Sequence, residues 1–210
     1  LLNNTIVKEI SGLSFVTLAR QGVIAVLTIL INNILIRVGD AIDVASYGII
    51  SRALMFALFP VIGVNQGFMP IAGYNYGAKK LQRVREAINI SITYSGILAL
   101  IIFTLIMLFA ESFVGVFISD KALEANSIRD NVALLERTPN ALRWVFAATP
   151  VIVIQLIGGS YFQSIGKIIP ALLLNLTKQG FFLIPLILIL PTYYGVWGVW
   201  VSFPIADVLS

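Results

Sequence analysis

The sequence predicts an all-α integral membrane fold, a six-transmembrane-helix bundle, and three observations lead to that prediction. Of its 210 residues, 59% are hydrophobic and only 11% are charged, whereas a soluble domain has about 25% charged residues. The mean hydropathy is +0.95, so a soluble core could not enclose the apolar surface, and the surplus must face lipid. The apolar residues also form long uninterrupted runs, which favours membrane-spanning helices over the alternating segments of a membrane β-barrel.

Six runs are long enough to be spans, since a helix needs roughly 20 apolar residues to cross the hydrocarbon. The expected spans are about 13–36, 45–72, 87–110, 144–165, 168–190 and 195–210. Only Gly166 and Lys167 separate the fourth span from the fifth, which predicts a tight helical hairpin. The sixth span is short and reaches the last residue, so we expect it to be cut. The charged segment 111–143 is expected to be a loop or amphipathic segment with solvated charges.

Basic loop residues predict the orientation, because cytoplasmic loops carry an excess of Lys and Arg. Lys79, Lys80, Arg83 and Arg85 lie within seven residues between the second and third spans, and Lys167 lies in the next loop on that side. We therefore expect a multi-pass protein with both chain ends in the cytoplasm. The opposite loops, which we expect outside, are mixed in sign and hold Arg37, Asp40, Asp43 and the segment 111–143.

The composition excludes several kinds of chemistry. The chain has no Cys and no His, which removes disulfides, thiol nucleophiles, Cys/His metal sites and histidine acid–base catalysis. No expected span contains two carboxylates, and the sequence lacks the zinc-hydrolase, nucleophile-elbow and phosphate-loop motifs. We therefore expect neither an enzyme nor a metal site in these spans, and no nucleic-acid partner.

Proline and glycine interrupt the second expected span. Pro60 removes a helix hydrogen bond and kinks the helix. The four-residue spacing of Gly63 and Gly67 lets two helix backbones approach closely in lipid. Plain helix packing would explain these residues, and the alternative is a span that bends and pivots in a protein that changes which side is open. The candidate hinge or packing residues are Pro60, Gly63, Gly67, Pro70, Gly73 and Gly77.

Polar side chains at membrane depth are the candidate site residues, because such groups are expensive in lipid and usually face a cavity or a partner. Lys178 lies near the middle of the fifth span and shares one helix face with Asn175 and Gln179. We expect Lys178 to face a cavity, with water, a carboxylate or both compensating its charge. Asp207 lies in a different span near its cytoplasmic end, where a helix-end ion pair is the alternative to a site in the cavity.

Two arginines and several amides complete the set of candidates. Snorkelling toward an interface is the alternative for Arg20 and Arg52, and interhelical hydrogen bonds are the alternative for the amides. The candidates for a substrate cavity or gate are Arg20, Gln21, Asn33, Arg52, Gln66, Gln155, Gln163, Asn175, Lys178, Gln179 and Asp207.

The second span and the turn after it carry a pattern that resembles a family signature. Residues 60–80 read PxxGxxQGxxPxxGYNYGAKK, which resembles the MATE (multidrug and toxic compound extrusion) family, in particular its bacterial multidrug-efflux branch. Further pieces agree in order, so that the resemblance covers nearly the whole chain. These pieces are LARQG, FQSIGK, TKQGFFLIPLILILP, GVWGVW and PIAD.

This resemblance implies a fold and a function. Family members have twelve spans in two six-helix lobes, and the six spans here resemble the second lobe, so the chain looks like the C-terminal half of a larger transporter in the bacterial plasma (inner) membrane. The family couples an inward Na⁺ or H⁺ gradient to the export of cationic, amphipathic drugs, while the lobes rock to alternate access. The implied partners are the lipid bilayer, the N-terminal six-helix lobe and small organic cations.

The position of the coupling ion follows from a departure within the family. One branch of the family places acidic cation ligands in the first and fourth spans of the second lobe. In this chain the corresponding spans, 13–36 and 144–165, contain no carboxylate. The resemblance therefore implies that the coupling ion, Na⁺ or H⁺, binds in the N-terminal lobe, and it implies no cofactor. Two alternatives stay open. One is a flippase for lipid-linked oligosaccharide from the same superfamily, which would hold pyrophosphate with cavity arginines, and the other is a non-transporting membrane scaffold.

Overall fold

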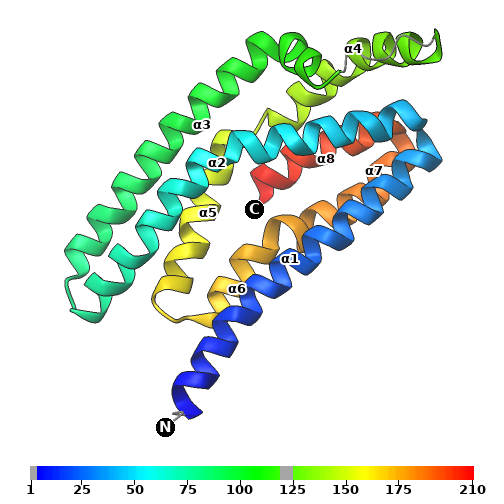
Figure 1. The fold of residues 1–210 in the computed structure, drawn as a ribbon. Coiled ribbons are helices and arrows are strands. Elements are labelled where there is room, and N and C mark those ends of the chain that lie inside the picture. Colours follow the sequence, from blue (N-terminus) through cyan, green and yellow to red (C-terminus); the bar gives the residue numbers. More distant parts are fainter. Residues whose placement is uncertain (1–3, 119–124) are drawn as a thin grey trace.

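The computed structural model describes residues 4–118 and 125–210, which form a bundle of long helices (Figure 1). The elements are α1 (Asn4–Val38), α2 (Ala41–Gly77), α3 (Leu81–Phe117), α4 (Ala125–Phe146), α5 (Thr149–Ser164), α6 (Ile168–Leu176), η1 (Thr177–Leu183), α7 (Ile184–Tyr194) and α8 (Val196–Leu209). Four runs are long and apolar enough to cross a membrane, namely Ile10–Val38, α2, α3 and the continuous run Ile168–Tyr194. The bent pair of α4 and α5 is a fifth candidate, and α8 is a shorter apolar helix. The predicted all-α membrane fold is confirmed.

The helices form two flanks with a central pair between them (Figure 1). On one flank α2 and α3 run side by side, and on the other α1 lies against α6 and α7. Between the flanks, α5 contacts α3 and α6, while α8 contacts α4, α7 and η1. The central position of α8 places its polar side chains inside the bundle.

Local backbone chemistry defines both ends of α2. At its start, the Asp40 carboxylate accepts a hydrogen bond from the Asp43 amide at 3.1 Å, and the Asp43 carboxylate accepts one from the Asp40 amide at 3.2 Å. This reciprocal pair is a capping box. At the other end, Lys79 has a φ of 58°, in the left-handed region where a helix can stop and the chain can reverse. The turn places the basic cluster of Lys79, Lys80, Arg83 and Arg85 at the tip of the α2–α3 hairpin.

The helix expected over 144–165 is divided in two. α4 runs through most of the segment expected to be a loop and ends at Phe146. Pro150 has no amide hydrogen to donate to the Phe146 carbonyl, so the helix cannot continue unbroken. α5 therefore begins at Thr149, with Pro150 in its first turn, where proline is tolerated. The two helices are bent by 47° relative to each other.

A π-helical segment, η1, joins α6 to α7 within the fifth expected span. In such a segment the backbone bonds join residues five apart, as from the Ile184 amide to the Gln179 carbonyl. Pro185, which cannot donate a backbone hydrogen bond, follows directly. Segments of this kind are rare inside α-helices and are frequent at functional sites. This segment was not predicted from the sequence.

Two groups of buried apolar side chains hold the helices together. The larger group lies where α4, α7 and α8 meet α2, and it includes Phe146, Ile187 and Trp200. The smaller group joins α2, α3 and α5 through side chains such as Phe68 and Ile157. Many large apolar side chains outside these groups stay exposed, as expected for a surface in contact with lipid.

Close backbone packing is found at one of the four candidate glycines of α2. A Cβ atom built at Gly73 would lie 3.0 Å from the carbonyl oxygen of Ser164 in α5. In the described ranges, nothing lies within 4 Å of a Cβ atom built at Gly63, Gly67 or Gly77. The close approach predicted for those three positions is therefore not found among the described residues, and the pivot of α2 stays a prediction.

Candidate functional site

An ion pair between η1 and α8 is the central feature of the candidate site. The Nζ atom of Lys178 lies 2.5 Å from Oδ1 of Asp207, and the two side chains are 17% and 1% exposed. At a rise of about 1.5 Å per residue, Lys178 lies roughly 15 Å along the helix from Ile168, and Asp207 lies about as far from Val196. With Ile168 and Val196 taken as the starts of their spans, these distances correspond to the middle of a hydrocarbon layer about 30 Å thick, whereas the sequence had placed Asp207 near the cytoplasmic end of its span.

One buried acceptor beside this pair lacks a partner. Oδ1 of Asp207 is held by the Lys178 ammonium, but Oε1 of Gln179, which is buried on the same π-helical segment as Lys178, accepts no hydrogen bond among the described residues. A buried acceptor is costly unless water or another donor satisfies it, so a donor beside Gln179 would lower that cost.

The partner of Lys178 differs from the sequence-based prediction. That prediction placed Lys178 in a cavity with water, a carboxylate or both beside it, and it placed Asp207 near the end of a different span. Asp207 is itself the carboxylate that neutralises Lys178, because α8 passes directly against η1. A lone ammonium at mid-span costs about 2.5–3.5 kcal/mol on insertion scales, and the carboxylate offsets that cost.

Three of the candidate amides make hydrogen bonds within the bundle. Nε2 of Gln155 donates to the Leu174 carbonyl at 3.0 Å and joins α5 to α6, and Nε2 of Gln163 donates to the Thr17 hydroxyl at 3.2 Å and joins α5 to α1. Nδ2 of Asn175 donates to the Ala171 carbonyl of its own helix at 2.7 Å. For Gln155 and Gln163 the structure therefore supports interhelical bonding, the second of the two alternatives.

The remaining candidates lie apart from the ion pair. Arg20 is half-buried on α1, and the other four are exposed on α1 and α2. Among the described residues, no ion pair joins Arg20 or Arg52 to an acid. The structure therefore does not bring these side chains together with Lys178 and Asp207. The four exposed candidates are Gln21, Asn33, Arg52 and Gln66.

A buried polar bond between α2 and α5 was missed from the sequence. Nδ2 of Asn65 donates to the Ser160 hydroxyl at 2.7 Å, and Oδ1 of Asn65 is buried without a hydrogen bond among the described residues. The neighbouring Gln66 was singled out instead, although it is exposed. Helical phase would have distinguished the two, because Asn65 lies four residues after Val61 and three before Phe68, both of which are buried.

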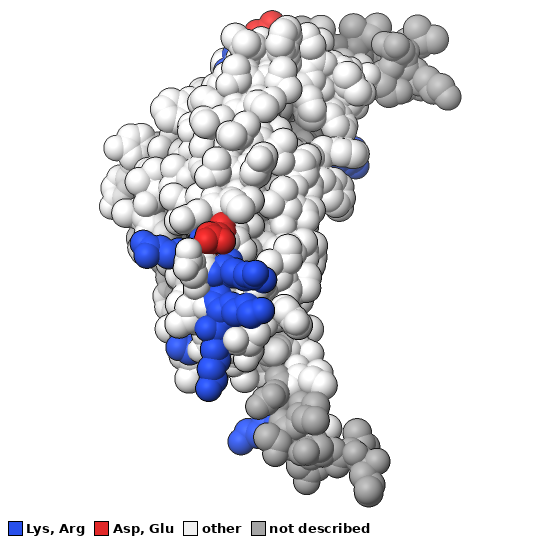
Figure 2. Space-filling view, turned by 90° about the vertical axis from the view of Figure 1, so that its left-hand side faces the viewer, with Lys and Arg blue, Asp and Glu red and all other residues white. Residues whose placement is uncertain are grey.

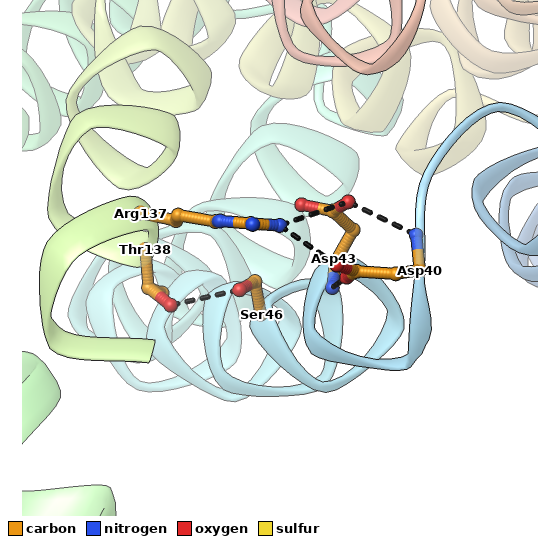
Figure 3. A network of polar contacts seen from close by, with 5 residues as sticks. All are labelled: Asp40, Asp43, Ser46, Arg137 and Thr138. Carbon is orange, nitrogen blue, oxygen red and sulfur yellow. Dashed lines mark hydrogen bonds and ion pairs between the residues drawn. The ribbon is translucent and has the colours of Figure 1, made fainter. Parts of the chain in front are cut away.

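A second polar network lies at the opposite end of α2 from the basic cluster (Figure 3). The Arg137 guanidinium of α4 lies 2.9 Å from the Asp40 carboxylate and 3.8 Å from that of Asp43. The hydroxyls of Ser46 and Thr138 make a buried hydrogen bond of 2.8 Å beside it. The network ties the amphipathic helix α4 to the start of α2.

The charges of 111–143 were expected to be solvated, and among the described residues Glu111, Arg129, Asp130, Glu136 and Arg137 are exposed. The position of Asp43 differs from the prediction. It was placed in a loop, but it is buried in the first turn of α2, with Arg137 beside it. Slight burial raises the pKa of the Asp40 carboxyl, but the Asp43 amide and the Arg137 guanidinium outweigh it and hold that pKa below its usual value. Asp40 therefore stays ionised and keeps its contact with Arg137 at neutral pH.

Comparisons with known proteins agree on one family. A MatE family model matches residues 18–189. The multidrug export protein MepA of Staphylococcus aureus (strain NCTC 8325 / PS 47) is 28% identical over 167 residues, which are 79% of this chain and 34% of that protein. MepA of Staphylococcus haemolyticus (strain JCSC1435) is 25% identical over 165 residues, which are 78% of this chain and 33% of that protein.

Solved structures show the same fold over the whole chain. The MATE multidrug transporter DinF-BH, solved in complex with a ligand, is 36% identical with a TM-score of 0.79, and the match covers 99% of this chain and 44% of that one. A MATE in complex with MaL6 has a TM-score of 0.87 at 20% identity, with 99% and 45% covered. The chain therefore spans about a third of the length of the curated relatives and under half of these structures.

Proposed function

Because the chain belongs to the MatE family of membrane transporters, we propose that it forms one six-helix lobe of a twelve-helix multidrug exporter. In this proposal a second, N-terminal lobe completes the substrate path, and the transporter exchanges Na⁺ or H⁺ for cationic, amphipathic compounds. MepA is named a multidrug export protein and DinF-BH a MATE multidrug transporter, which supports drug export as the activity. The coverage of under half of each solved chain supports the two-lobe arrangement.

The observation that carries the proposal furthest is the ion pair of Lys178 and Asp207 near mid-membrane. Charged residues inside spans are rare and mark ion or substrate pathways. Lys178 lies on a π-helical segment, and the neighbouring span is broken between α4 and α5. Broken helices around a midplane site are the usual construction of secondary transporters. We assign Lys178 the role of a gate whose contact with Asp207 changes as the lobes rock.

The coupling ion is proposed to bind in the N-terminal lobe. The expected spans 13–36 and 144–165 carry no carboxylate, and Asp207 is already neutralised by Lys178. A free acid for Na⁺ or H⁺ must then come from the partner lobe. The flippase alternative receives less support, because Arg20 and Arg52 do not converge with Lys178 on one cavity.

Transport by reconstituted vesicles tests this function. The complete transporter containing this chain should move ethidium, an organic cation dye, when a Na⁺ or H⁺ gradient is imposed, and an ionophore that dissipates the gradient should stop it. The 210-residue chain by itself should move none. Movement of a labelled lipid-linked oligosaccharide without movement of dye would select the flippase, and movement of neither would select the scaffold.

Orientation is proposed from the basic cluster, with both chain ends and the α2–α3 turn in the cytoplasm. The chain has no cysteine, so single cysteines can be introduced without removing others. In intact cells, cysteine at Gln82 should resist a membrane-impermeant thiol reagent, and cysteine at Asp130 should react with it. Both positions are exposed. The reverse labelling pattern would invert the topology.

A further inference from the structure

A groove between α2 and α3, next to their connecting turn, is unused by the proposed transport mechanism. It has a volume of about 450 Å³ and extends from Val64 and Ile90, the end away from the turn, to Asn75 and Arg83 at its rim beside the turn. Gly67 lies on its wall, and nothing lies within 4 Å of a Cβ atom built there. The missing side chain therefore keeps the groove open.

The groove changes from apolar to polar along its length. Val64 and Asn75 lie eleven positions apart on α2, which corresponds to roughly 16 Å along the helix axis. The part away from the turn is lined mainly by aliphatic side chains that include Val64, Ile71 and Ile90, with Ser91 as a polar exception, and the rim carries the guanidinium of Arg83. Such a gradient matches a molecule with an acyl chain at one end and a polar group at the other.

The rim is strongly positive. Lys79, Lys80 and Arg85 are all exposed on the same turn as Arg83, and Figure 2 shows basic side chains gathered at that end of the molecule around an acidic one. No side chain caps the N terminus of α3, so its first amides add partial positive charge. Glu86 also lines the groove, and its carboxylate accepts a hydrogen bond from Nε2 of Gln82 at 3.2 Å but keeps its charge. The four basic residues outnumber this one carboxylate, so the net charge at the rim favours an anion.

We propose that this groove binds an anionic phospholipid of the adjoining leaflet. The phosphate lies against Arg83 and the free amides at the start of α3, and one acyl chain runs along Ile71, Gly67 and Val64. A zwitterionic lipid of the same length fits the apolar part but gains less from the surrounding charges. This site is independent of the transported substrate and of the coupling ion.

Native mass spectrometry of the complete protein in detergent tests the proposal. Phosphatidylglycerol should bind roughly fivefold more tightly than phosphatidylcholine with the same acyl chains. Arg83→Gln should remove most of that preference. Arg85→Gln is the matched control, because it removes the same charge from the same turn but does not line the groove, and it should change the preference less than about twofold. Equal losses of the lipid preference in the two variants would show that general surface charge causes it, and would contradict a lipid site in the groove.

Two further experiments test whether an acyl chain occupies the groove and whether the bound phosphate belongs to a lipid. Gly67→Leu fills the groove without touching the basic rim, so it should weaken long-chain phosphatidylglycerol and leave a short-chain form unaffected. Inorganic phosphate at the same concentration should not displace the long-chain lipid. Displacement by inorganic phosphate, or unchanged long-chain binding in Gly67→Leu, would show that no acyl chain occupies the groove.

Discussion

Replacing Lys178 with methionine should destabilise the complete transporter and also stop drug export. The change leaves the buried Asp207 carboxylate without its counter-charge. Removing one member of a buried pair costs about 3–5 kcal/mol, so the thermal unfolding temperature in detergent should fall markedly. If Lys178 faced a cavity, as the sequence alone predicts, the same substitution would leave the expression level of the transporter near normal.

The double variant Lys178→Met with Asp207→Leu separates stability from function. Replacing both members of a buried pair by apolar groups is often neutral or stabilising, so this variant should unfold near the wild-type temperature. Its dye export should stay absent, because the proposed gate is missing. A single variant as stable as wild type would mean that the pair does not form, and a double variant that exports normally would remove the gating role.

Gly198→Ala should disrupt the packing of α7 against α8. A Cβ atom at Gly198 would lie 2.5 Å from the carbonyl carbon and oxygen of Leu190 and 2.6 Å from the nitrogen of Pro191. All three are backbone atoms, so the two helices must move apart. Overpacking of this kind costs about 1–3 kcal/mol or more, which should lower the thermal unfolding temperature.

Gly48→Ala on α2 is the matched control for Gly198→Ala. Nothing in the described part of the chain lies within 4 Å of a Cβ atom at Gly48, and alanine is favoured over glycine in a helix by roughly 1 kcal/mol. The control should therefore leave the unfolding temperature unchanged or raise it. Similar destabilisation in both variants would contradict the close contact between α7 and α8.

The long helices could be predicted from the sequence because apolar length alone identifies them. α1, α2 and α3 contain the expected spans 13–36, 45–72 and 87–110. The break before Pro150 was not predicted, and 144–165 was expected to be one span. The residues on both sides of the break are apolar, and composition does not distinguish a bent pair of helices from one helix. The extent of α4 was missed, because its charged residues alternate with apolar ones that pack on α2.

The site was harder to predict than the fold. Lys178 was identified from its depth, but its partner lies 29 positions along the chain, and the crossing of η1 with α8 cannot be read from either helix alone. The same limit applies to Gly198. The motif GVWGVW was noted, but a close approach of two backbones depends on how the neighbouring helix lies. The candidate glycines of α2 had the favourable spacing, and among the described residues only Gly73 of that set meets another helix.

The π-helical segment has a consequence for how related sequences should be aligned. A π-turn holds one residue more than an α-turn, so the residues after it are rotated by about 100° relative to an unbroken helix. The apolar stripe of α6 therefore does not continue in phase into α7. A relative with one residue fewer within Thr177–Leu183 could form a regular α-helix there and keep the same faces buried on both sides. The same deletion within α7, before Ile187, would turn Ile187 out of the core.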